Sequence, residues 1–413
     1  MSLNSEKCSY KWVALALIWS AVFFQQGVRQ IYSATLPTVM TSLDISSVQI
    51  GLVGTVFTFV YGITVLSAGF ISDLLSRKWV LVSGVLLFSV GGLFSGFASG
   101  VGALVMSYGV LNGLGQPLVF PPGMSLLMQL HGEDTRATAL SVMQSAIYVG
   151  IIVCAVGSGA LANLGESGWR GAYWIVGGLG LLCFLLMAFV LKNTQAVQAN
   201  PADKASLGEA LKAVASKPSA ILYGIYLILL NSVTIGFMTW TPALVKDSFA
   251  HLSLREAVFH AVVWLNLSAL IGVFVGGRLG DRFAVRRRTV RLEILSLGVL
   301  FSAFAWFFVA LSPSLALCCL SLAFAGFSRG LLDSNLNVAF FDVIKPRYHA
   351  SALGFMLGLS FIFGSLAPVL LGWMRQTFTL RAGVMTFPVF YLVSLALILL
   401  ARFRFYLKDR ENK

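Results

Sequence analysis

Twelve apolar stretches run through this sequence, and they restrict its fold more than any other feature. Each has about 20 residues or more, the length that a helix needs to cross roughly 30 Å of hydrocarbon. A backbone in hydrocarbon must satisfy its own hydrogen bonds, so such stretches predict helices. The chain is 58% hydrophobic and 11% charged, which also indicates an all-α membrane protein. The predicted spans are residues 12–40, 48–72, 79–99, 102–130, 138–164, 171–192, 218–245, 256–280, 290–311, 315–343, 350–374 and 382–405.

A short motif occurs twice, each time where an apolar stretch ends. GFISDLLSRK starts at Gly69, and GGRLGDRFAVRRR starts at Gly276. Asp73 of the first copy matches Asp281 of the second, 208 residues later. Internal repeats of this kind are typical of membrane transporters. We therefore predict two pseudo-symmetric six-helix bundles, residues 1–192 and 218–413, joined by a cytoplasmic linker at 193–217 that contains a short surface helix.

The basic residues are distributed unevenly between the connections. The formal net charge is +13, which in a soluble protein would suggest a nucleic-acid partner. If the N-terminus is cytoplasmic, 22 of the 29 Lys and Arg residues fall on the cytoplasmic side and five fall outside, as the positive-inside rule requires. We therefore assign the charge to orientation in a plasma (inner) membrane with both termini cytoplasmic, and we expect no nucleic-acid partner.

Neither catalysis nor cofactor binding is indicated. The sequence offers no nucleophile with a base, no paired acids and no metal-ligand spacing within the membrane, so we expect no enzyme and no metal site. It also has no Walker A glycine loop, which argues against an ATP-driven pump. Transport would then draw on an ion or solute gradient, without a cofactor.

The two six-span halves, the linker and the repeated motif together resemble the major facilitator superfamily of secondary transporters. GQPLVFPPGMSLLMQ in span 4, followed by RATALSV, is similar to the organic-anion branch, which includes the anion:cation symporters and the organophosphate antiporters. RGLLDSNLNVAFFDVIKPRYHASALGFM in spans 10 and 11 is similar to hexuronate-type transporters. The resemblance implies alternating access to a central site in a protein that usually acts as a monomer.

The charges of the repeated motif have a candidate role in gating. The two acids can bond helix ends and basic groups at the cytoplasmic side and so hold the protein closed there. The other interpretation is that these charges only anchor helix ends at the membrane surface. The candidate gating residues are Asp73, Arg77, Asp281 and Arg282.

Arg29 is a charged residue near the middle of span 1, together with Gln26 and Gln30 on one helix face and Tyr32 beside it. A charge within a span is costly and therefore indicates function. An arginine offers a planar fork of donors that matches a carboxylate or a phosphate. In the families resembled, the span 1 arginine binds the anion. The alternative is that Arg29 bonds carbonyl groups or a glutamine and only ties helices together.

Span 10 contains a second charged group, Arg329 with Asp333 four residues later. The two residues can pair on one helix face. A titratable acid held in such a pair can load and release a proton, so Asp333 with Arg329 is the candidate for proton coupling. A purely structural pair and a direct substrate contact remain alternatives. The symporters resembled commonly carry the coupling glutamate in span 4, where this chain has Gln116, and this difference argues against ordinary proton symport.

Other polar and aromatic groups at midspan depth are candidates for lining the site. Amides and hydroxyls suit a hydroxyl-rich ligand, although such groups also hold membrane helices together at about 0.6 to 2 kcal/mol each. Prolines at 37, 117, 121 and 122 are expected to break spans 1 and 4. Besides Arg29, the candidate substrate-binding residues are Gln26, Gln30, Tyr32, Gln116, Gln144, Tyr148, Asn231, Trp264, Asn266 and Asn337.

The sequence therefore predicts a proton-coupled secondary transporter of a small organic anion, with a hexuronate or an aldonate as the preferred substrate. Its partners would be the anion, protons or a counter-transported anion, and the lipid bilayer. Two alternatives remain open. One is an exchanger of organophosphates or other anions in which Arg29 and Arg329 clamp a dianion, although span 7 lacks the second arginine usual there. The other is a spinster-like transporter of lysolipids or other amphiphiles.

Overall fold

Helices account for nearly all of the described structure. The computed structural model describes residues 2–74, 76–165, 167–193, 207–284, 286–287 and 289–411, without the side chains of 2–9, 68–74, 133–134, 137, 207, 210, 350 and 411. No β-strand occurs among the described residues. Twelve of their helical segments are long and apolar enough to cross a membrane. The predicted all-α fold with twelve spans is confirmed.

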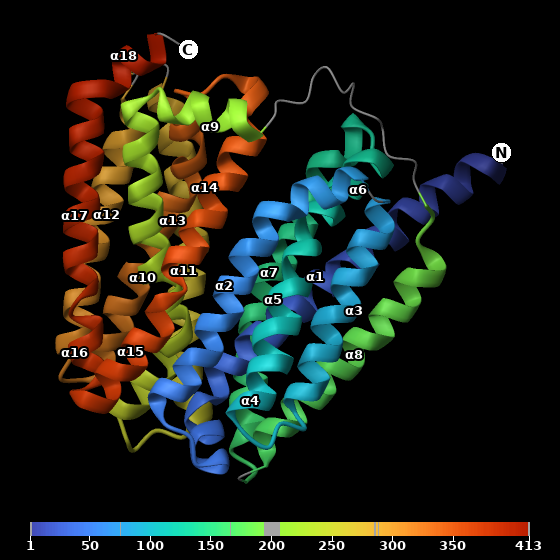
Figure 1. Cartoon of the computed structure of the whole chain (residues 1–413), viewed down its shortest axis with the longest axis vertical. Coiled ribbons are helices and arrows are strands. Elements are labelled where there is room, and N and C mark those ends of the chain that lie inside the picture. Colours follow the sequence, from blue (N-terminus) through green and yellow to red (C-terminus); the bar gives the residue numbers. More distant parts are fainter. Residues whose placement is uncertain are drawn as a thin grey trace. The chain divides into compact units, whose positions relative to one another are not determined.

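The chain forms two compact units (Figure 1). The first unit consists of Met1–Val197 together with Ala250–Phe259. The second consists of Gln198–Phe249 together with His260–Lys413.

The first unit is a helical bundle in which α1 packs along α7 and α8, and α3 packs along α8. Where α1 meets α7, a Cβ added at Gly150 would lie 2.7 Å from the carbonyl oxygen of Phe23. Small residues on α7 therefore allow the two backbones to approach closely. Apart from the composite fourth span, the helices of this unit are α1 (Ser2–Leu43), α2 (Ser47–Leu74), α3 (Arg77–Ser95), α7 (Glu133–Ala162) and α8 (Gly168–Val190).

The fourth span changes its helical geometry several times. It consists of α4 (Val101–Leu104), a π-helical stretch (Val105–Asn112), α5 (Gly113–Gly115), a 3-10 turn (Gln116–Leu118) and α6 (Phe120–Leu130). Proline lacks a backbone N–H, so Pro117 and the Pro121–Pro122 pair interrupt the regular ladder here as expected. The expected break at Pro37 is wrong, because α1 continues through it to Leu43. Pro37 lies in the last two turns of a 42-residue helix, and the packed helix tolerates the loss of one hydrogen bond.

The second unit is a bundle in which α12 packs on α13 and α17, and α10 packs on α14 and α17. A Cβ added at Gly326 of α13 would overlap the carbonyl oxygen of Leu265 on α11, so α13 crosses α11 at a glycine. The helices are α9 (Leu207–Ala215), α10 (Pro218–Ser248), α11 (Leu254–Ala284), α12 (Val290–Leu311), α13 (Leu315–Phe341), α14 (His349–Gly364), α15 (Leu366–Thr377), α16 (Leu380–Val384), α17 (Phe387–Leu400) and α18 (Tyr406–Glu411), with a 3-10 turn at Pro346–Tyr348 and a π-helical stretch at Ala401–Phe405.

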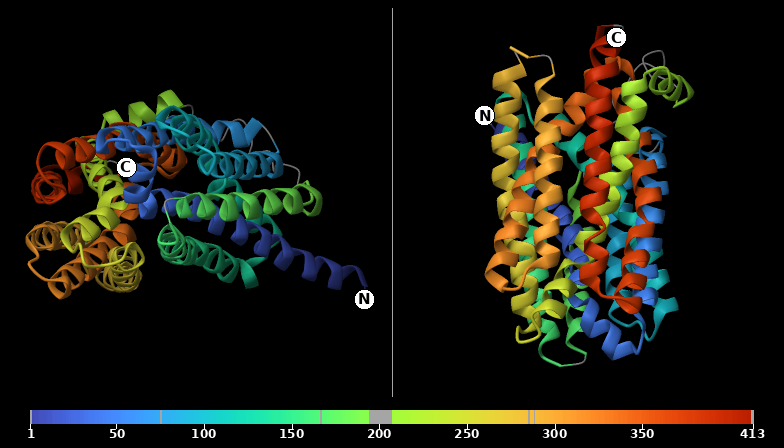
Figure 2. Two further views of the ribbon diagram at one scale, coloured as in Figure 1. Left: turned by 90° about the horizontal axis from the view of Figure 1, so that it is seen from below. Right: turned by 90° about the vertical axis from the view of Figure 1, so that its left-hand side faces the viewer.

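A contact between the two ends of this unit's sequence caps α10. The buried carboxylate of Asp409 accepts hydrogen bonds from the backbone N–H of Ser219 at 2.9 Å and from its hydroxyl at 2.6 Å. Lys217 donates to the backbone carbonyl of Asp409 at 3.2 Å. A carboxylate at this position satisfies an N–H that the helix leaves unpaired and favours the positive end of its dipole. Figure 2 shows the C-terminal segment, in red, beside the start of α10, in yellow-green.

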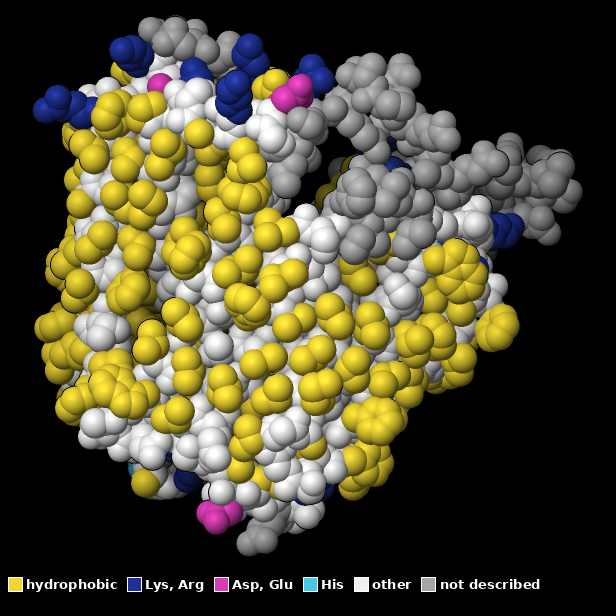
Figure 3. All heavy atoms as spheres, viewed as in Figure 1, with side chains coloured by type: hydrophobic (Ala, Val, Ile, Leu, Met, Phe, Trp, Pro, Cys, Tyr) yellow, Lys and Arg dark blue, Asp and Glu magenta, His cyan; other side chains and the backbone are white. Residues whose placement is uncertain are grey.

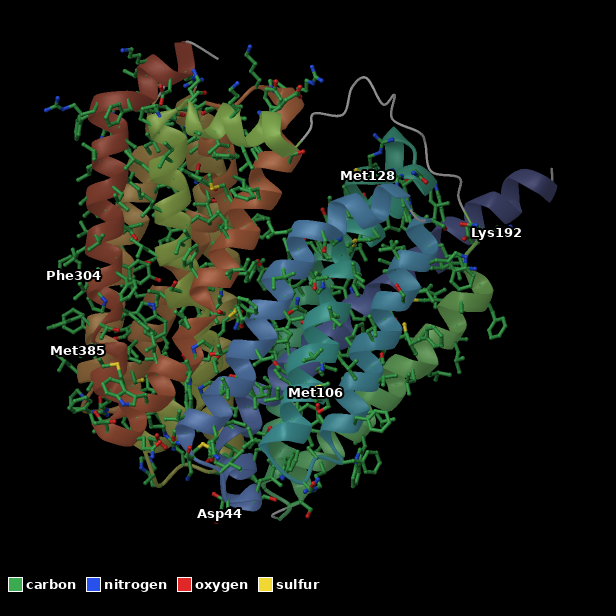
Figure 4. The ribbon with its side chains drawn as sticks, viewed as in Figure 1. Asp44, Met106, Met128, Lys192, Phe304 and Met385 are labelled. Carbon is green, nitrogen blue, oxygen red and sulfur yellow. The ribbon has the colours of Figure 1, made fainter. Side chains whose placement is uncertain are left out.

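The flanks of the bundles are apolar. Figure 3 shows hydrophobic side chains along the sides of the helices, and Lys and Arg side chains at the end of the second unit that carries α18. Phe304 projects outward from α12 (Figure 4), and its surface is more than half exposed. Exposed apolar flanks are what contact with lipid requires.

Candidate functional site

Arg29 lies against two aromatic rings in the first unit. Its guanidinium carbon is 5.5 Å from the centre of the Phe57 ring and 5.7 Å from that of the Tyr61 ring, both on α2. The residue is half-buried. No acidic side chain among the described residues forms an ion pair with it. Arg29 is therefore held by cation–π contacts, which leave its planar fork of donors without a carboxylate.

Further aromatic rings support this arrangement. Tyr32 stacks on Tyr108 of the fourth span with ring centres 4.3 Å apart, and Tyr108 lies 5.1 Å from Phe57. The Tyr32 hydroxyl donates to the carbonyl oxygen of Ile50 at 2.5 Å. Tyr32 is buried, so it orients the rings around Arg29 and uses its hydroxyl within the protein.

Buried amides connect α1 to the break in the fourth span. Gln25 donates through Nε2 to the backbone carbonyl of Gln116 at 2.6 Å. Oε1 of Gln25 and Nε2 of Gln116 have no hydrogen-bond partner among the described residues, although both atoms are buried. An unpaired buried amide atom costs about 1 to 3 kcal/mol, which favours a water molecule or a ligand at this point. Gln25 was not among the predicted site residues. The sequence does not show that Gln25 lies beside Gln116, because the two residues are on different helices.

The remaining candidates of the first unit differ in exposure. Gln30 is buried, and Gln26 packs against Gly150 of α7. On α7, Gln144 is exposed and Tyr148 is half-buried, one helical turn apart. The structure thus places Gln26 and Gln30 on the same helix as Arg29 and leaves Gln144 available for contacts.

The second unit contains the Arg329–Asp333 pair on α13. Nε of Arg329 is 3.4 Å from Oδ2 of Asp333, and the two side chains are 22% and 43% exposed. The Arg329 guanidinium also lies 5.5 Å from the centre of the Phe237 ring on α10. The carboxylate is therefore accessible while it remains compensated by a neighbouring positive charge.

Tyrosines from two other helices lie in the neighbourhood of this pair. Tyr226 of α10 interacts electrostatically with Asp333, and Tyr391 of α17 interacts with both Arg329 and Asp333. The Tyr226 hydroxyl has no hydrogen-bond partner among the described residues. Tyr226 and Tyr406 both line an apolar cavity of about 30 Å³. This cavity has enough space for a water molecule. Tyr391 was not identified from the sequence, whereas the spacing of Tyr223 and Tyr226, one turn apart, predicts that both face a shared cavity.

The amide candidates of the second unit form contacts within it. Asn337 accepts from the hydroxyl of Tyr223 at 3.4 Å, and Asn231 of α10 donates to Ser360 of α14 at 2.7 Å. Two further candidates bond within α11. Asn266 is buried and donates to the carbonyl oxygen of Val262 at 2.8 Å, while Trp264 donates to Nδ1 of His260 at 3.1 Å.

The motif acid Asp281 belongs to a small charge network at one end of the second unit. Its Oδ1 lies 3.7 Å from Arg291 Nη2, and Arg291 Nη1 lies 3.5 Å from Asp342 Oδ2. The Tyr406 hydroxyl donates to the same oxygen of Asp342 at 2.8 Å. Arg291 thus joins the end of α11 to the end of α13. This residue was not named as a gating candidate from the sequence.

The other motif residues are less connected. Arg282 lies 6.0 Å from the centre of the Phe283 ring, and Arg77 is half-buried at the first position of α3. The side chain of Asp73 lies outside the described residues, so its predicted contacts stay a prediction.

Comparison with known proteins decides the family. Residues 18–368 match the family described as Major Facilitator Superfamily. The chain belongs to this superfamily. It is an integral, multi-pass membrane transporter and not an enzyme, and the predicted resemblance and fold are confirmed.

Several curated relatives of this superfamily member are similar along most of their length. A protein named "Probable hexose phosphate transport protein" from Chlamydia pneumoniae is 23% identical over 73% of this chain and 72% of its own. The "Probable sulfoacetate transporter SauU" of Cupriavidus necator is 26% identical over 89% of this chain and 86% of its own. "Protein spinster homolog 1" of Bos taurus is 25% identical over 82% and 68%.

Solved structures of superfamily members share the fold. A bacterial homologue of the human lysosomal transporter spinster, in an inward-facing and unoccupied conformation, matches with a TM-score of 0.85 at 19% identity over 97% of this chain and 98% of that one. The nucleoside transporter NupG matches with a TM-score of 0.74 at 16% identity over 95% and 99%. At these identities the similarity concerns the fold alone.

Proposed function

We propose that this superfamily member transports a small organic anion and that Arg29 binds the anion's carboxylate. The supporting observation is a charged side chain within a span that has no acidic partner among the described residues. Placing such a charge in a membrane costs about 2.5 to 3.5 kcal/mol, and an aromatic ring returns about 0.5 to 1 kcal/mol at an exposed site. A carboxylate bound to the guanidinium fork would add charge-assisted hydrogen bonds that the two rings cannot supply.

The preferred substrate class is a sugar acid such as a hexuronate or an aldonate. Its hydroxyl groups would bond to amides and hydroxyls of the first unit, namely Gln26 and Gln30 on the helix of Arg29, and Gln144 and Tyr148 on α7. The unpaired amide atoms of Gln25 and Gln116 would suit the same chemistry. Sulfoacetate and hexose phosphate, which appear in the names of two relatives, are organic anions. These names support an anionic substrate.

Asp333 is the proposed proton-coupling residue in this mechanism. Its carboxylate is 43% exposed and pairs with Arg329, so a proton can reach it. Protonation would break the ion pair and release Arg329 toward Phe237 and Tyr391. The substrate gradient and the proton gradient would be linked through this one pair.

Exchange of organophosphates is the second candidate. It is favoured by the relatives from Chlamydia that are named as hexose phosphate transport proteins. Arg329 would then serve as an anion-binding residue. Its ion pair with Asp333 would break when a dianion binds. Exchange and proton coupling differ in whether a proton gradient alone drives accumulation.

The proposed topology has both termini in the cytoplasm and the protein in the plasma (inner) membrane, acting as a monomer. Alternating access would come from movement of two bundles, residues 1–192 and 218–413. Residues 193–217 would form the cytoplasmic linker between them. The Lys and Arg side chains at the α18 end of the second unit (Figure 3) support this orientation. Asp73, Arg77, Asp281 and Arg282 would gate the cytoplasmic side, with Arg291 as an additional partner.

Thermal unfolding of the purified protein against a ligand panel tests this proposal. The panel contains hexuronates, aldonates, other carboxylates, organophosphates and lysolipids. A ligand at 100 times its dissociation constant adds about 2.7 kcal/mol to the free energy of unfolding. We expect sugar acids to stabilise the wild type and not Arg29→Ala, which should itself remain folded.

Other outcomes of the panel change the assignment. Stabilisation by organophosphates alone would favour exchange, and stabilisation by lysolipids alone would favour a spinster-like activity. Equal stabilisation of the wild type and Arg29→Ala by a sugar acid would remove Arg29 from the site.

A further inference from the structure

A cavity that is not lined by Arg329 or Asp333 lies at the end of the second unit. It has a volume of about 400 Å³ and is bordered by Lys217, Lys345 and Tyr348 together with Ile344 and small residues of the α9 end. Cavities that bind small ligands in proteins typically have volumes of about 300 to 1,000 Å³. The cavity is therefore large enough for a phosphorylated headgroup.

The charges around the cavity favour an anion. Two of its lining residues are lysines, and no acidic residue lines it within the part of the chain that the structure describes. Lys345 is exposed at the end of the connection that follows α13. The nearby acid Glu209 forms an ion pair with Arg347, at 3.8 Å, on the adjoining surface. The carboxylate of Asp409 bonds to Ser219. A phosphate in the cavity would thus meet the ammonium group of Lys345, the hydroxyl of Tyr348 and the ammonium group of Lys217, which also donates to the carbonyl oxygen of Asp409.

The helix beside the cavity covers the end of the second unit. Along α9, Val214 is buried against the unit while Glu209 and Lys212 are exposed. It packs against α10 and α14, and Figure 1 shows it lying across their ends rather than along them. The cavity beside it therefore lies among helix ends, outside the apolar lengths of α10 and α14.

We propose that this cavity binds the phosphate of an anionic phospholipid through Lys217, Lys345 and Tyr348. Basic pockets at helix ends are suited to anionic headgroups. A lipid is the favoured source of the phosphate because Lys and Arg side chains gather at this end of the unit (Figure 3), as they do where a membrane protein meets anionic headgroups. Neither Arg329 nor Asp333 lines the cavity.

The test measures thermal unfolding of the full chain in a neutral detergent. The protein is titrated with short-chain phosphatidylglycerol, with phosphatidylcholine of the same chain length, with glycerol 3-phosphate and with inorganic phosphate. Lys345→Gln removes one lining charge. Lys408→Gln is the matched control, because Lys408 is exposed at the same end of the unit and does not line the cavity.

We expect phosphatidylglycerol to stabilise the wild type and Lys408→Gln at the same concentrations. Lys345→Gln should require about five times more, as expected for one lysine near an anionic headgroup. Lys345→Arg should retain the wild-type response, and Tyr348→Phe gives a second variant that preserves the charges. An equal response of Lys345→Gln and Lys408→Gln would overturn the site. Equal stabilisation by glycerol 3-phosphate or inorganic phosphate would replace the lipid with a soluble phosphate.

Discussion

Arg329 and Asp333 form an ion pair one turn apart on α13, with Nε of the arginine 3.4 Å from Oδ2 of the acid. Arg29 contacts aromatic rings instead and has no ion-pair partner among the described residues. The two arginines within spans therefore have different electrostatic surroundings. A compensated charge is suited to titration, and an uncompensated charge is suited to binding an anion.

Asp333→Asn is expected to separate exchange from accumulation. The amide keeps the shape of the side chain and cannot take up a proton, so substrate exchange should continue while a proton gradient no longer drives uptake. Counterflow and gradient-driven uptake in proteoliposomes measure the two activities. Asp247→Asn is the control, because that acid pairs with Arg375 outside this cluster. Normal accumulation by Asp333→Asn would assign coupling elsewhere.

Arg29→Lys should weaken substrate binding although it keeps the positive charge. A lysine lacks the planar fork that holds a carboxylate through two bonds. Losing one hydrogen bond to a charged group costs about 1.5 to 3 kcal/mol, so the dissociation constant should rise by roughly 10-fold to 150-fold. Ligand titrations followed by thermal unfolding measure this change.

Arg170→Lys is the matched control for that substitution. Arg170 donates to the carbonyl oxygens of Gly96 and Ala98 at 2.9 and 2.7 Å, away from the Arg29 cluster. The Arg170→Lys variant should leave the affinity for the substrate unchanged. If both lysine variants bind the substrate like the wild type, the guanidinium fork of Arg29 does not recognise it.

Asp342→Asn should destabilise the protein more than Asp281→Asn. Asp281 is 84% exposed, and an exposed ion pair contributes about 0 to 1 kcal/mol. Asp342 is 20% exposed and also accepts from Tyr406, so the loss there should reach about 1 to 3 kcal/mol. Denaturation of the two variants under one set of conditions provides the comparison. A larger effect at Asp281 would show that the motif acid has stronger contacts than its ion pair with Arg291.

Gly326→Ala should destabilise the crossing of α13 and α11. The added Cβ would overlap the carbonyl oxygen of Leu265, and backbone atoms cannot yield without moving a helix. Overpacking of this kind costs about 1 to 3 kcal/mol. Gly354→Ala on α14 is the control, because a Cβ there meets no atom within 4 Å. Equal thermal stability of the two variants would mean that the helices separate easily at this point.

The sequence was sufficient to predict the spans, because hydrocarbon thickness fixes their length and composition fixes their polarity. Arg29 was identifiable for the same reason, since a charge within a span is costly wherever it lies. The surroundings of Arg29 were not identifiable. Phe57 and Tyr61 lie on another helix, and nothing in their spacing indicates which way α2 faces.

Polar residues were harder to interpret than charged ones. Gln25 and Asn266 are both amides in apolar spans, yet Gln25 bonds across to Gln116 while Asn266 bonds to its own helix. Composition does not distinguish these cases, because both satisfy the same requirement for a partner. Arg291 was missed for a related reason. From sequence alone, a basic residue near a helix end indicates the orientation of the span. Its ion-pair partners become known only from the structure.

The cap on α10 has a consequence for the order of events during biosynthesis. Ser219 and its acceptor Asp409 are separated by 190 positions in the chain. The ribosome completes α10 long before it reaches Asp409. The first turn of that helix therefore lacks its carboxylate acceptor while every later span is inserted. The second unit therefore closes late, when α18 arrives, and a nascent chain halted before residue 409 would leave α10 without this cap.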